Sequence, residues 1–262
     1  MLGFTPPTAN YTADEYDVLL IHADQADGTA GTDIIDSATS KTITAGGDAQ
    51  VDTAQYKNLT GSTGSILFDG TGDYLTLANS DDWAFPADWT MDFWVRFASL
   101  RTEEGTDCYL FSGTGHTPFS IWMYHNGTAL NLAIYRDGGS FYVKPLWYPE
   151  INTWYHLAFG RAGTAYNTYM NGVSIGSTTN SSNFASAEIF IGSNYNGAVS
   201  LNGWVDEFRV SKGIARDWAP AFSGEQFIWI SKFINNLNYN KIGTPAWSLK
   251  IKAMGLWKNL RG

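Results

Sequence analysis

Seven Asp-Gly or Asn-Gly dipeptides divide most of this chain into short segments. Asn and Asp tolerate positive φ and Gly adopts it freely, so these pairs suit the tight turns that join antiparallel strands. The dipeptides begin at Asp27, Asp69, Asn126, Asp137, Asn171, Asn196 and Asn202. Their spacing favours a fold made of many short strands.

The segments between these turns are rich in β-branched and aromatic residues, as strands are. They cover 17–22, 66–77, 90–97, 119–124, 129–135, 153–160, 188–192 and 204–210. Within one of them Tyr155, Leu157 and Phe159 alternate with polar or small residues, which is the period of a strand. We therefore expect an all-β, two-sheet antiparallel jelly-roll sandwich over residues 16–222, with Trp89, Phe93 and Trp94 near its core.

Two terminal segments fall outside this pattern: a short N-terminal arm, 1–15, and a C-terminal tail, 223–262. The chain's net charge is −9, yet residues 224–262 carry six basic residues and one acid. The beginning of the tail has apolar residues at helical spacing, so we expect it to be partly helical. Its predicted assembly residues are Phe227, Trp229, Ile230, Phe233, Trp247 and Trp257. Such a tail must pack on its own sandwich, on a sister subunit or on another protein.

Composition excludes several classes of protein. Aromatic residues make up 15% of the chain and charged residues only 16%, which suits a large core and argues against global disorder. The acidic body argues against nucleic-acid binding. No apolar run approaches the length of a membrane span, and the first residues lack the pattern of a signal peptide. Cys108 is the one cysteine, which excludes an intrachain disulfide and a Cys-rich zinc site.

Three segments together resemble a known family. They are 65–97, with Asp69-Gly70 and a Trp-rich strand; 153–177, with a Tyr-x-Asn-Gly turn; and 201–216, which contains Gly-Trp-Val-Asp-Glu-Phe-Arg. In this order they resemble the laminin-G-like, concanavalin-A-like jelly roll, and the opening strand near 17–29 is similar as well. The resemblance covers about 16–222 and implies the same sandwich.

The sequence does not predict an enzyme. Sugar-cleaving relatives of this sandwich carry a run of carboxylates along one strand, whereas the strand around Asp92 has no second acid. Residues 172–176 match G-x-S-x-G around Ser174, but that motif needs a strand-to-helix turn, and here it follows an Asn-Gly turn. Asp206 and Glu207 are adjacent, so regular alternation predicts that they point to opposite faces.

The resemblance also implies a structural calcium ion. Relatives often hold calcium through an Asp on the last strand and oxygens near the first strand, which correspond to Asp206 and Asp24. The alternative is that Asp206 pairs with Arg209 or caps backbone amides. The four histidines, His22, His116, His125 and His156, are dispersed, and this spacing favours structural roles over metal binding.

Aromatic residues in the middle of the chain are candidates for a carbohydrate site, because aromatic faces beside polar groups stack on sugar rings. They are Trp122, Tyr124, Tyr135, Tyr142, Trp147 and Tyr148. The alternative is that these side chains belong to the core, where alternate aromatic residues of a sandwich usually lie.

The resemblance implies a non-enzymatic, homo-oligomeric surface protein of a bacteriophage virion: a tail-fibre, baseplate or head-decoration protein. Its jelly roll would contact surface carbohydrate or a host receptor, and its tail would bind sister subunits or other virion proteins. Two alternatives stay open. One is a purely structural decoration protein that cements its neighbours, and the other is a secreted, extracellular carbohydrate-binding module or adhesin.

Overall fold

The computed structural model describes residues 5–100, 105–125, 130–136, 140–143 and 145–216. Their strands form two antiparallel sheets, and only two single-turn 3-10 helices, η1 (Asp81–Trp83) and η2 (Thr114–His116), accompany them. The predicted all-β, two-sheet sandwich is confirmed. The tail and its predicted assembly residues lie outside the described residues.

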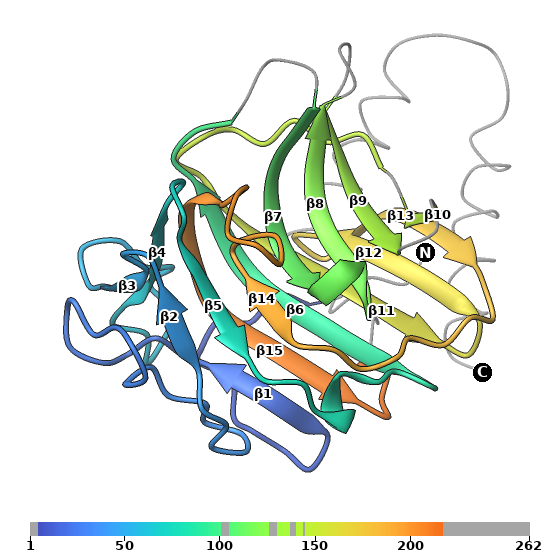
Figure 1. The fold of residues 1–262 in the computed structure, drawn as a ribbon, viewed down its shortest axis with the longest axis horizontal. Coiled ribbons are helices and arrows are strands. Elements are labelled where there is room, and N and C mark those ends of the chain that lie inside the picture. Colours follow the sequence, from blue (N-terminus) through green and yellow to red (C-terminus); the bar gives the residue numbers. More distant parts are fainter. Residues whose placement is uncertain (1–4, 101–104, 126–129, 137–139, 144, 217–262) are drawn as a thin grey trace, which may run out of the picture. The chain divides into compact units, whose positions relative to one another are not determined.

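Sheet one has eight strands, and the last strand of the sandwich lies in its interior (Figure 1). In spatial order they are β13 (Val173–Thr179), β12 (Ala165–Met170), β11 (Trp154–Ala162), β6 (Trp89–Phe97), β15 (Asn202–Lys212), β4 (Ser65–Asp69) and β3 (Gln50–Asp52), and β1 (Asp17–Ile21) also pairs with β15. β15 bonds to β6 on one edge, and to β4 and β1 at successive positions along the other. The two ends of the described chain therefore meet in this sheet.

Sheet two has seven strands. In spatial order they are β10 (Ser140–Val143), β9 (Leu130–Arg136), β8 (Ser120–His125), β7 (Gly105–Gly113), β14 (Ile189–Ile191), β5 (Tyr74–Leu77) and β2 (Thr44–Gly46). Every pairing of the described strands in both sheets is antiparallel, in agreement with the predicted hairpin turns.

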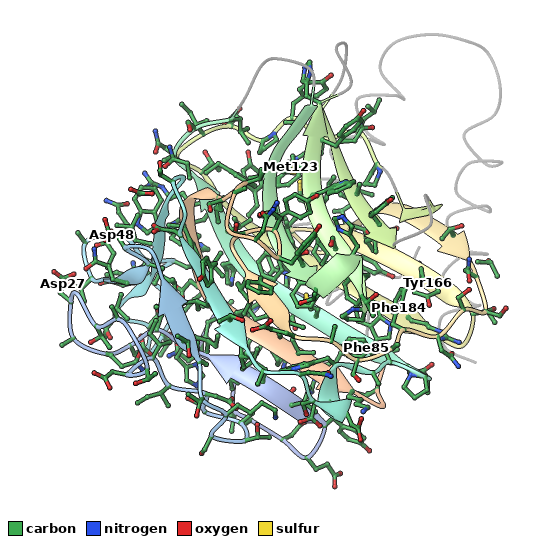
Figure 2. All side chains as sticks on the ribbon, viewed as in Figure 1. Asp27, Asp48, Phe85, Met123, Tyr166 and Phe184 are labelled. Atoms are coloured by element: carbon green, nitrogen blue, oxygen red, sulfur yellow. The ribbon has the colours of Figure 1, made fainter. Side chains whose placement is uncertain are left out.

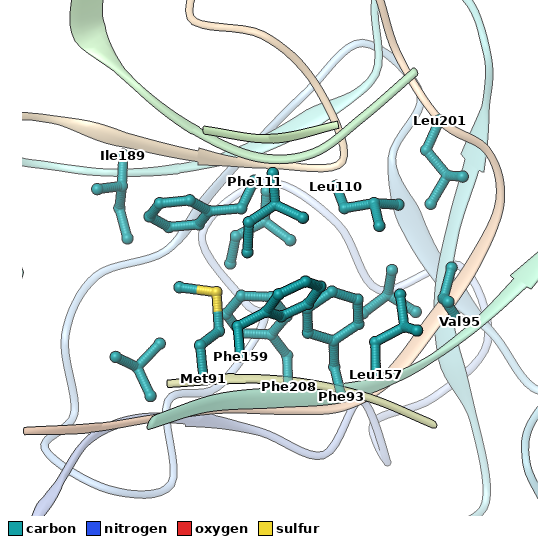
Figure 3. Packing of buried hydrophobic residues seen from close by; sticks show 14 of the residues in the cluster. Met91, Phe93, Val95, Leu110, Phe111, Leu157, Phe159, Ile189, Leu201 and Phe208 are labelled. Carbon is teal, nitrogen blue, oxygen red and sulfur yellow. The ribbon is translucent and has the colours of Figure 1, made fainter. Parts of the chain in front are cut away.

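The core lies between the sheets and is built by alternation along the strands. Figure 3 shows Phe93, Phe159 and Phe208 from sheet one facing Phe111 and Ile189 from sheet two. The rings of Phe93 and Phe208 stack with centroids 5.0 Å apart. Each such buried side chain contributes about 1.5–3 kcal/mol by leaving water.

A second aromatic group closes one end of the sandwich. Phe85, Phe184 and Tyr166 lie together there (Figure 2), around the fully buried Trp89. Trp89 and Phe93 thus belong to the core as predicted. Trp94 does not: it is buried on the outer face of sheet one, with its ring 5.1 Å from that of His156. Because side chains alternate along β6, Phe93 and Trp94 cannot both point inward.

No helix in the described part of the chain has the length and hydropathy needed to cross a membrane.

Candidate functional site

Six aromatic rings, two of them buried and the others more exposed, gather on the outer face of sheet two, and we call this group the aromatic face. Its members are Tyr109 on β7, Trp122 and Tyr124 on β8, Tyr135 on β9, and His116 and Tyr195 from two loops. Alternation explains their direction, since Ile121, Met123 and Ile134 on the same strands point into the core. The side chains between them must then point outward.

His116 lies at the centre of the aromatic face. Its ring centroid is 5.1 Å from that of Tyr135, 5.6 Å from those of Trp122 and Tyr195, and 6.0 Å from that of Tyr109. The backbone enters the left-handed region at both Gly115 and His116, and the Nδ1 atom of His116 lies 2.9 Å from Ser120 Oγ. A tight turn after β7 therefore presents this imidazole.

The aromatic face has a buried floor and an accessible rim. Trp122 is 9% exposed and stacks on Tyr135 at 4.8 Å, whereas Tyr195 is 40% exposed and Tyr135 and Tyr124 are half-buried. Burial, with Tyr135 and Tyr195 nearby, raises the pKa of Tyr109, so its phenol stays protonated at neutral pH. Rings that lie beside phenol and imidazole groups can contact the apolar face of a sugar and also bond its hydroxyls.

Three of the six predicted carbohydrate-binding residues meet here: Trp122, Tyr124 and Tyr135. The structure does not bring Trp147 to this surface, because its ring packs in the core against Phe97 and Tyr155 and is 7% exposed. Tyr148 is 60% exposed in the segment after β10. Tyr142 lies on β10, and its side chain is outside the described part of the structure.

The sequence analysis missed Tyr109, His116 and Tyr195. Tyr109 could have been found from alternation along 105–113, although the register of β7 shifts at this residue. The loops that carry His116 and Tyr195 show no such period, so only the tertiary structure brings these two side chains to the strands.

A second polar group lies on the outer face of sheet one, and we call it the carboxylate cluster: His22, Asp24, Asp206 and Glu207. Ligand atoms of His22, Asp24 and Glu207 all lie within 4.8 Å of one another. Ser62 and Thr63 tie Asp206 to Asp24, because Ser62 Oγ donates to Asp206 (3.1 Å) and the Thr63 amide donates to Asp24 (2.6 Å).

A β-bulge in β15 brings Asp206 and Glu207 to the same side, so the prediction from regular alternation is wrong. The register with β6 shifts between Asp206 and Arg209, and Glu207 has a φ of 51°. Val205 and Phe208 on either side both enter the core. A bulge places one extra residue between them, and two consecutive carboxylates therefore face outward.

The cluster concentrates negative charge in a buried place. Glu207 Oε1 lies 2.6 Å from His22 Nδ1, and Asp206 accepts the Lys57 amide at 2.9 Å. Burial, with the Glu207 and Asp24 carboxylates, raises the pKa of Asp206 to about 7. Burial alone would lower the pKa of His22, but its hydrogen bond to Glu207 and the neighbouring carboxylates raise it.

Some buried side-chain oxygens of the cluster and of the residues next to it have no hydrogen-bond partner. Within the described residues, Asp206 Oδ1, Asn10 Oδ1 and Gln25 Oε1 are buried with no hydrogen-bond partner. Asn10 donates to Asp24 through its Nδ2 atom, and Gln25 follows Asp24 in the chain. Carboxylate and amide oxygens are the ligands that calcium prefers. The predicted pair Asp24 and Asp206 thus lies in surroundings that fit a calcium ion.

Of the two alternatives for Asp206, a pair with Arg209 is wrong, because Arg209 pairs with Asp92, whereas a bond from a backbone amide is present, from Lys57. Its Nε and Nη2 atoms lie 3.0 and 3.1 Å from the two Asp92 oxygens, and both side chains are buried. Burial by itself would raise the pKa of Asp92, but Arg209 and His156 lower it to about 2. Tyr11 Oη donates to the same carboxylate, and the Arg209 guanidinium lies 3.6 Å from the Tyr11 ring centroid.

Ser174 lies on β13, which pairs antiparallel with β12 directly after the Asn171-Gly172 turn. This is a β-hairpin, so Ser174 lacks the strand-to-helix turn that a nucleophile of the G-x-S-x-G type needs.

Comparison with known proteins agrees with this architecture. The family model described as Concanavalin A-like lectin/glucanases superfamily matches residues 69–217. No curated protein matches the sequence. Among solved structures, domain 4 of AbnA, an extracellular GH43 arabinanase from Geobacillus stearothermophilus in complex with arabinotriose, is 21% identical with a TM-score of 0.52, over 75% of this chain and 92% of that one.

Botulinum neurotoxin structures are similar as well. One is of type C, from work on cell entry through two ganglioside molecules: 10% identity, TM-score 0.54, over 82% of this chain and 50% of that one. Another is the binding domain of neurotoxin DC in complex with SialylT, with 12% identity and a TM-score of 0.54, over 77% and 49%. The chain spans about half the length of these two structures. At such identities the likeness concerns the fold alone.

Proposed function

Because the chain belongs to the concanavalin A-like lectin/glucanases superfamily, we propose that it is a non-enzymatic carbohydrate-binding domain. The single observation that carries this proposal is the aromatic face: six rings from three strands and two loops of sheet two, with a rim of half-exposed side chains. The structural neighbours support it, since domain 4 of AbnA was solved with arabinotriose and a botulinum binding domain with SialylT.

The rim residues contact the sugar in this proposal. Tyr195, Tyr135 and Tyr124 offer ring surface and hydroxyls, and His116 offers a second kind of polar group between them. Trp122 and Tyr109 form the floor and hold the rim rings in place. A single site of this kind binds weakly, and many copies on one particle raise the strength of adhesion through effective concentration.

Calcium has a structural role in the proposal. Asp24 and Glu207, which with His22 have ligand atoms within 4.8 Å of one another, would hold the ion together with the predicted Asp206, whose pKa is raised by burial and by its two acidic neighbours. The ion would neutralise these charges on the outer face of sheet one. The aromatic face belongs to the other sheet, so the ion stabilises the fold and takes no part in sugar contact.

We place the domain on the exposed surface of a virion, with sister subunits and other virion proteins as its partners. The support for this placement is the sequence resemblance and the basic, apolar tail. Mass spectrometry of purified particles should detect the chain; its absence there, together with its presence in culture medium, would favour the extracellular alternative.

A glycan array tests the binding proposal, with the protein displayed on beads so that many sites act together. Arabino-oligosaccharides and sialylated glycans are the first probes. We expect Tyr195→Ala to weaken binding about two- to tenfold, because a stacked ring contributes about 0.5–1.5 kcal/mol. Tyr16→Ala is the matched control: Tyr16 is 38% exposed against 40% for Tyr195, and it precedes β1 in sheet one.

If Tyr195→Ala and Tyr16→Ala weaken glycan binding equally, the aromatic face is not the binding site. A wild-type protein that binds no glycan in multivalent form would leave the purely structural decoration protein as the better explanation. Hydrolysis of any bound glycan that disappears on mutating one Asp or Glu would overturn the non-enzymatic assignment.

A further inference from the structure

The N-terminal arm crosses the carboxylate cluster. Residues of the arm bond to the loop before β4, where the Asn10 amide donates to the Thr60 carbonyl at 3.0 Å and the Thr60 amide donates to the Thr8 carbonyl at 3.1 Å. Two consecutive arm residues then reach the cluster itself. Asn10 Nδ2 lies 2.5 Å from Asp24 Oδ2, and the Tyr11 amide donates to Glu207 Oε2 at 2.7 Å.

These contacts come from neutral amide groups and bring no positive charge to the cluster. Asp24, Asp206 and Glu207 carry up to three negative charges, and Arg209, a buried cation on the same strand as Asp206 and Glu207, is already paired with Asp92. The partly buried His22 is bonded to Glu207 alone among these three carboxylates. Buried carboxylates need a counter-charge, because leaving them unpaired costs several kcal/mol.

The arm also contributes a side-chain oxygen that is available as a ligand. Asn10 Oδ1 is buried without a hydrogen-bond partner in the described structure, as is Asp206 Oδ1. Asp206 itself is 1% exposed. The backbone turns into the left-handed region at Ala23, between the cluster residues His22 and Asp24, and at Glu207 on β15. Strain of this kind persists where a functional arrangement requires it.

We propose that Asn10 is a ligand of the calcium ion held by Asp24, Asp206 and Glu207, and that the ion thereby fixes the N-terminal arm on sheet one. Asn10 Oδ1 supplies a neutral oxygen and the carboxylates supply the charge. The residues that follow Asn10 then keep their positions on sheet one. Tyr11 in particular stays in contact with Asp92 and Arg209. Arm docking and ion binding are coupled, so each strengthens the other.

Hydrogen exchange of the full chain, with calcium or with EDTA, tests this coupling. The amides of Asn10 and Tyr11 exchange when the arm lifts, and an ion that binds only the docked arm makes this opening rarer by the factor 1 + [L]/Kd. At a calcium concentration about 100 times Kd we expect exchange there to slow up to about 100-fold. Amides of β8, on sheet two, provide the internal reference.

Asn10→Asp separates ligation from a simple hydrogen bond. This variant keeps an oxygen ligand but replaces the donor to Asp24 with a charge that repels it. We expect its arm to exchange rapidly in EDTA and to regain protection in calcium. Asn10→Ala should lose protection in both conditions and bind calcium at least about tenfold more weakly by titration calorimetry. Thr8→Ala, a change of an exposed arm side chain, should behave as the wild type.

Three results would overturn the proposal. The first is the absence of calcium binding by the metal-free wild type. The second is calcium binding that leaves exchange of Asn10 and Tyr11 unchanged. The third is an Asn10→Asp variant that stays unprotected in saturating calcium, which would show that the arm needs only the amide donor. None of these results bears on the aromatic face, so carbohydrate binding stands or falls separately.

Discussion

Asp92 carries a charge in the middle of sheet one, at a position that water does not reach. Two hydrogen bonds from Arg209, the Tyr11 hydroxyl and the nearby His156 surround it. The pair stabilises the fold only while both partners are present. Removing one leaves the other as an uncompensated buried charge, which typically costs about 3–5 kcal/mol.

Asp92→Asn should therefore lower the free energy of unfolding by about 3–5 kcal/mol in urea denaturation. Asp33→Asn, a change at an exposed carboxylate, should cost less than about 0.5 kcal/mol. Equal effects of the two substitutions would mean that the Asp92–Arg209 pair contributes nothing specific.

The same pair predicts a direction for the pH dependence of stability. The pKa of Asp92 in the folded chain is about 2, below the ordinary value of 3.8. The unfolded chain thus takes up this proton first as pH falls. The contribution is complete above about pH 4 and is lost as pH falls toward 2. In Asp92→Asn the decline of stability over this window should be shallower, as acid titration followed by circular dichroism will show.

Asp206 differs from Asp92, because its ionised carboxylate is destabilised by burial and by the charges of Glu207 and Asp24. In EDTA we expect Asp206→Asn to raise the melting temperature by about 2–4 °C, which corresponds to about 1 kcal/mol in a chain of this size. In millimolar calcium the wild type should gain stability and the variant should not. A variant that is destabilised in both conditions would speak against a cation site.

At the scale of elements, the turn between β7 and β8 decides the shape of the aromatic face. Gly113 ends β7, and a Cβ atom placed on it would lie 1.6 Å from the Thr117 carbonyl oxygen. Backbone packs directly against backbone here, and this close approach fixes the short helix η2 that carries His116. Only glycine leaves enough room.

We expect Gly113→Ala to lower the free energy of unfolding by about 1–3 kcal/mol and to shift the imidazole resonances of His116 in NMR spectra. Gly72→Ala is the control, since a Cβ there would meet no atom within 4 Å and would cost only its left-handed backbone, about 1 kcal/mol. Unchanged His116 resonances in a folded Gly113→Ala protein would show that the turn does not depend on this contact.

At the scale of the whole molecule, all the strands that the structure describes lie between Asp17 and Lys212. Both sheets, as far as the structure describes them, are thus formed by residues that precede the predicted tail. Truncation at Ser223 should leave the melting temperature almost unchanged, while the native oligomer and incorporation into particles should be lost. Light scattering and particle assays measure both. A truncated chain that still assembles would make the assembly role of 223–262 wrong.

The sequence by itself determined the class of fold and the direction of most strand side chains. Turn dipeptides and two-residue alternation are local properties, so they predict antiparallel strands and a core that contains Phe93, Leu157 and Phe159. Whether Trp122 and Tyr135 face outward or into the core stayed open in the sequence, and the structure places both on the outer face. Alternation along β6 also predicts that Trp94 points away from the core. Our expectation that Trp94 lies in the core therefore disagreed with the pattern on which it was based.

Only the tertiary structure decided the two candidate sites. The bulge at Glu207 is a shift in the register of β15 with β6, a strand more than 100 residues earlier in the chain, and no local signal reports that register. Tyr11 meets Glu207 across 196 positions of sequence, and His116 meets Tyr195 from separate loops. Contacts of this kind depend on how strands are ordered in a sheet, which is a property of the whole chain and not of any segment.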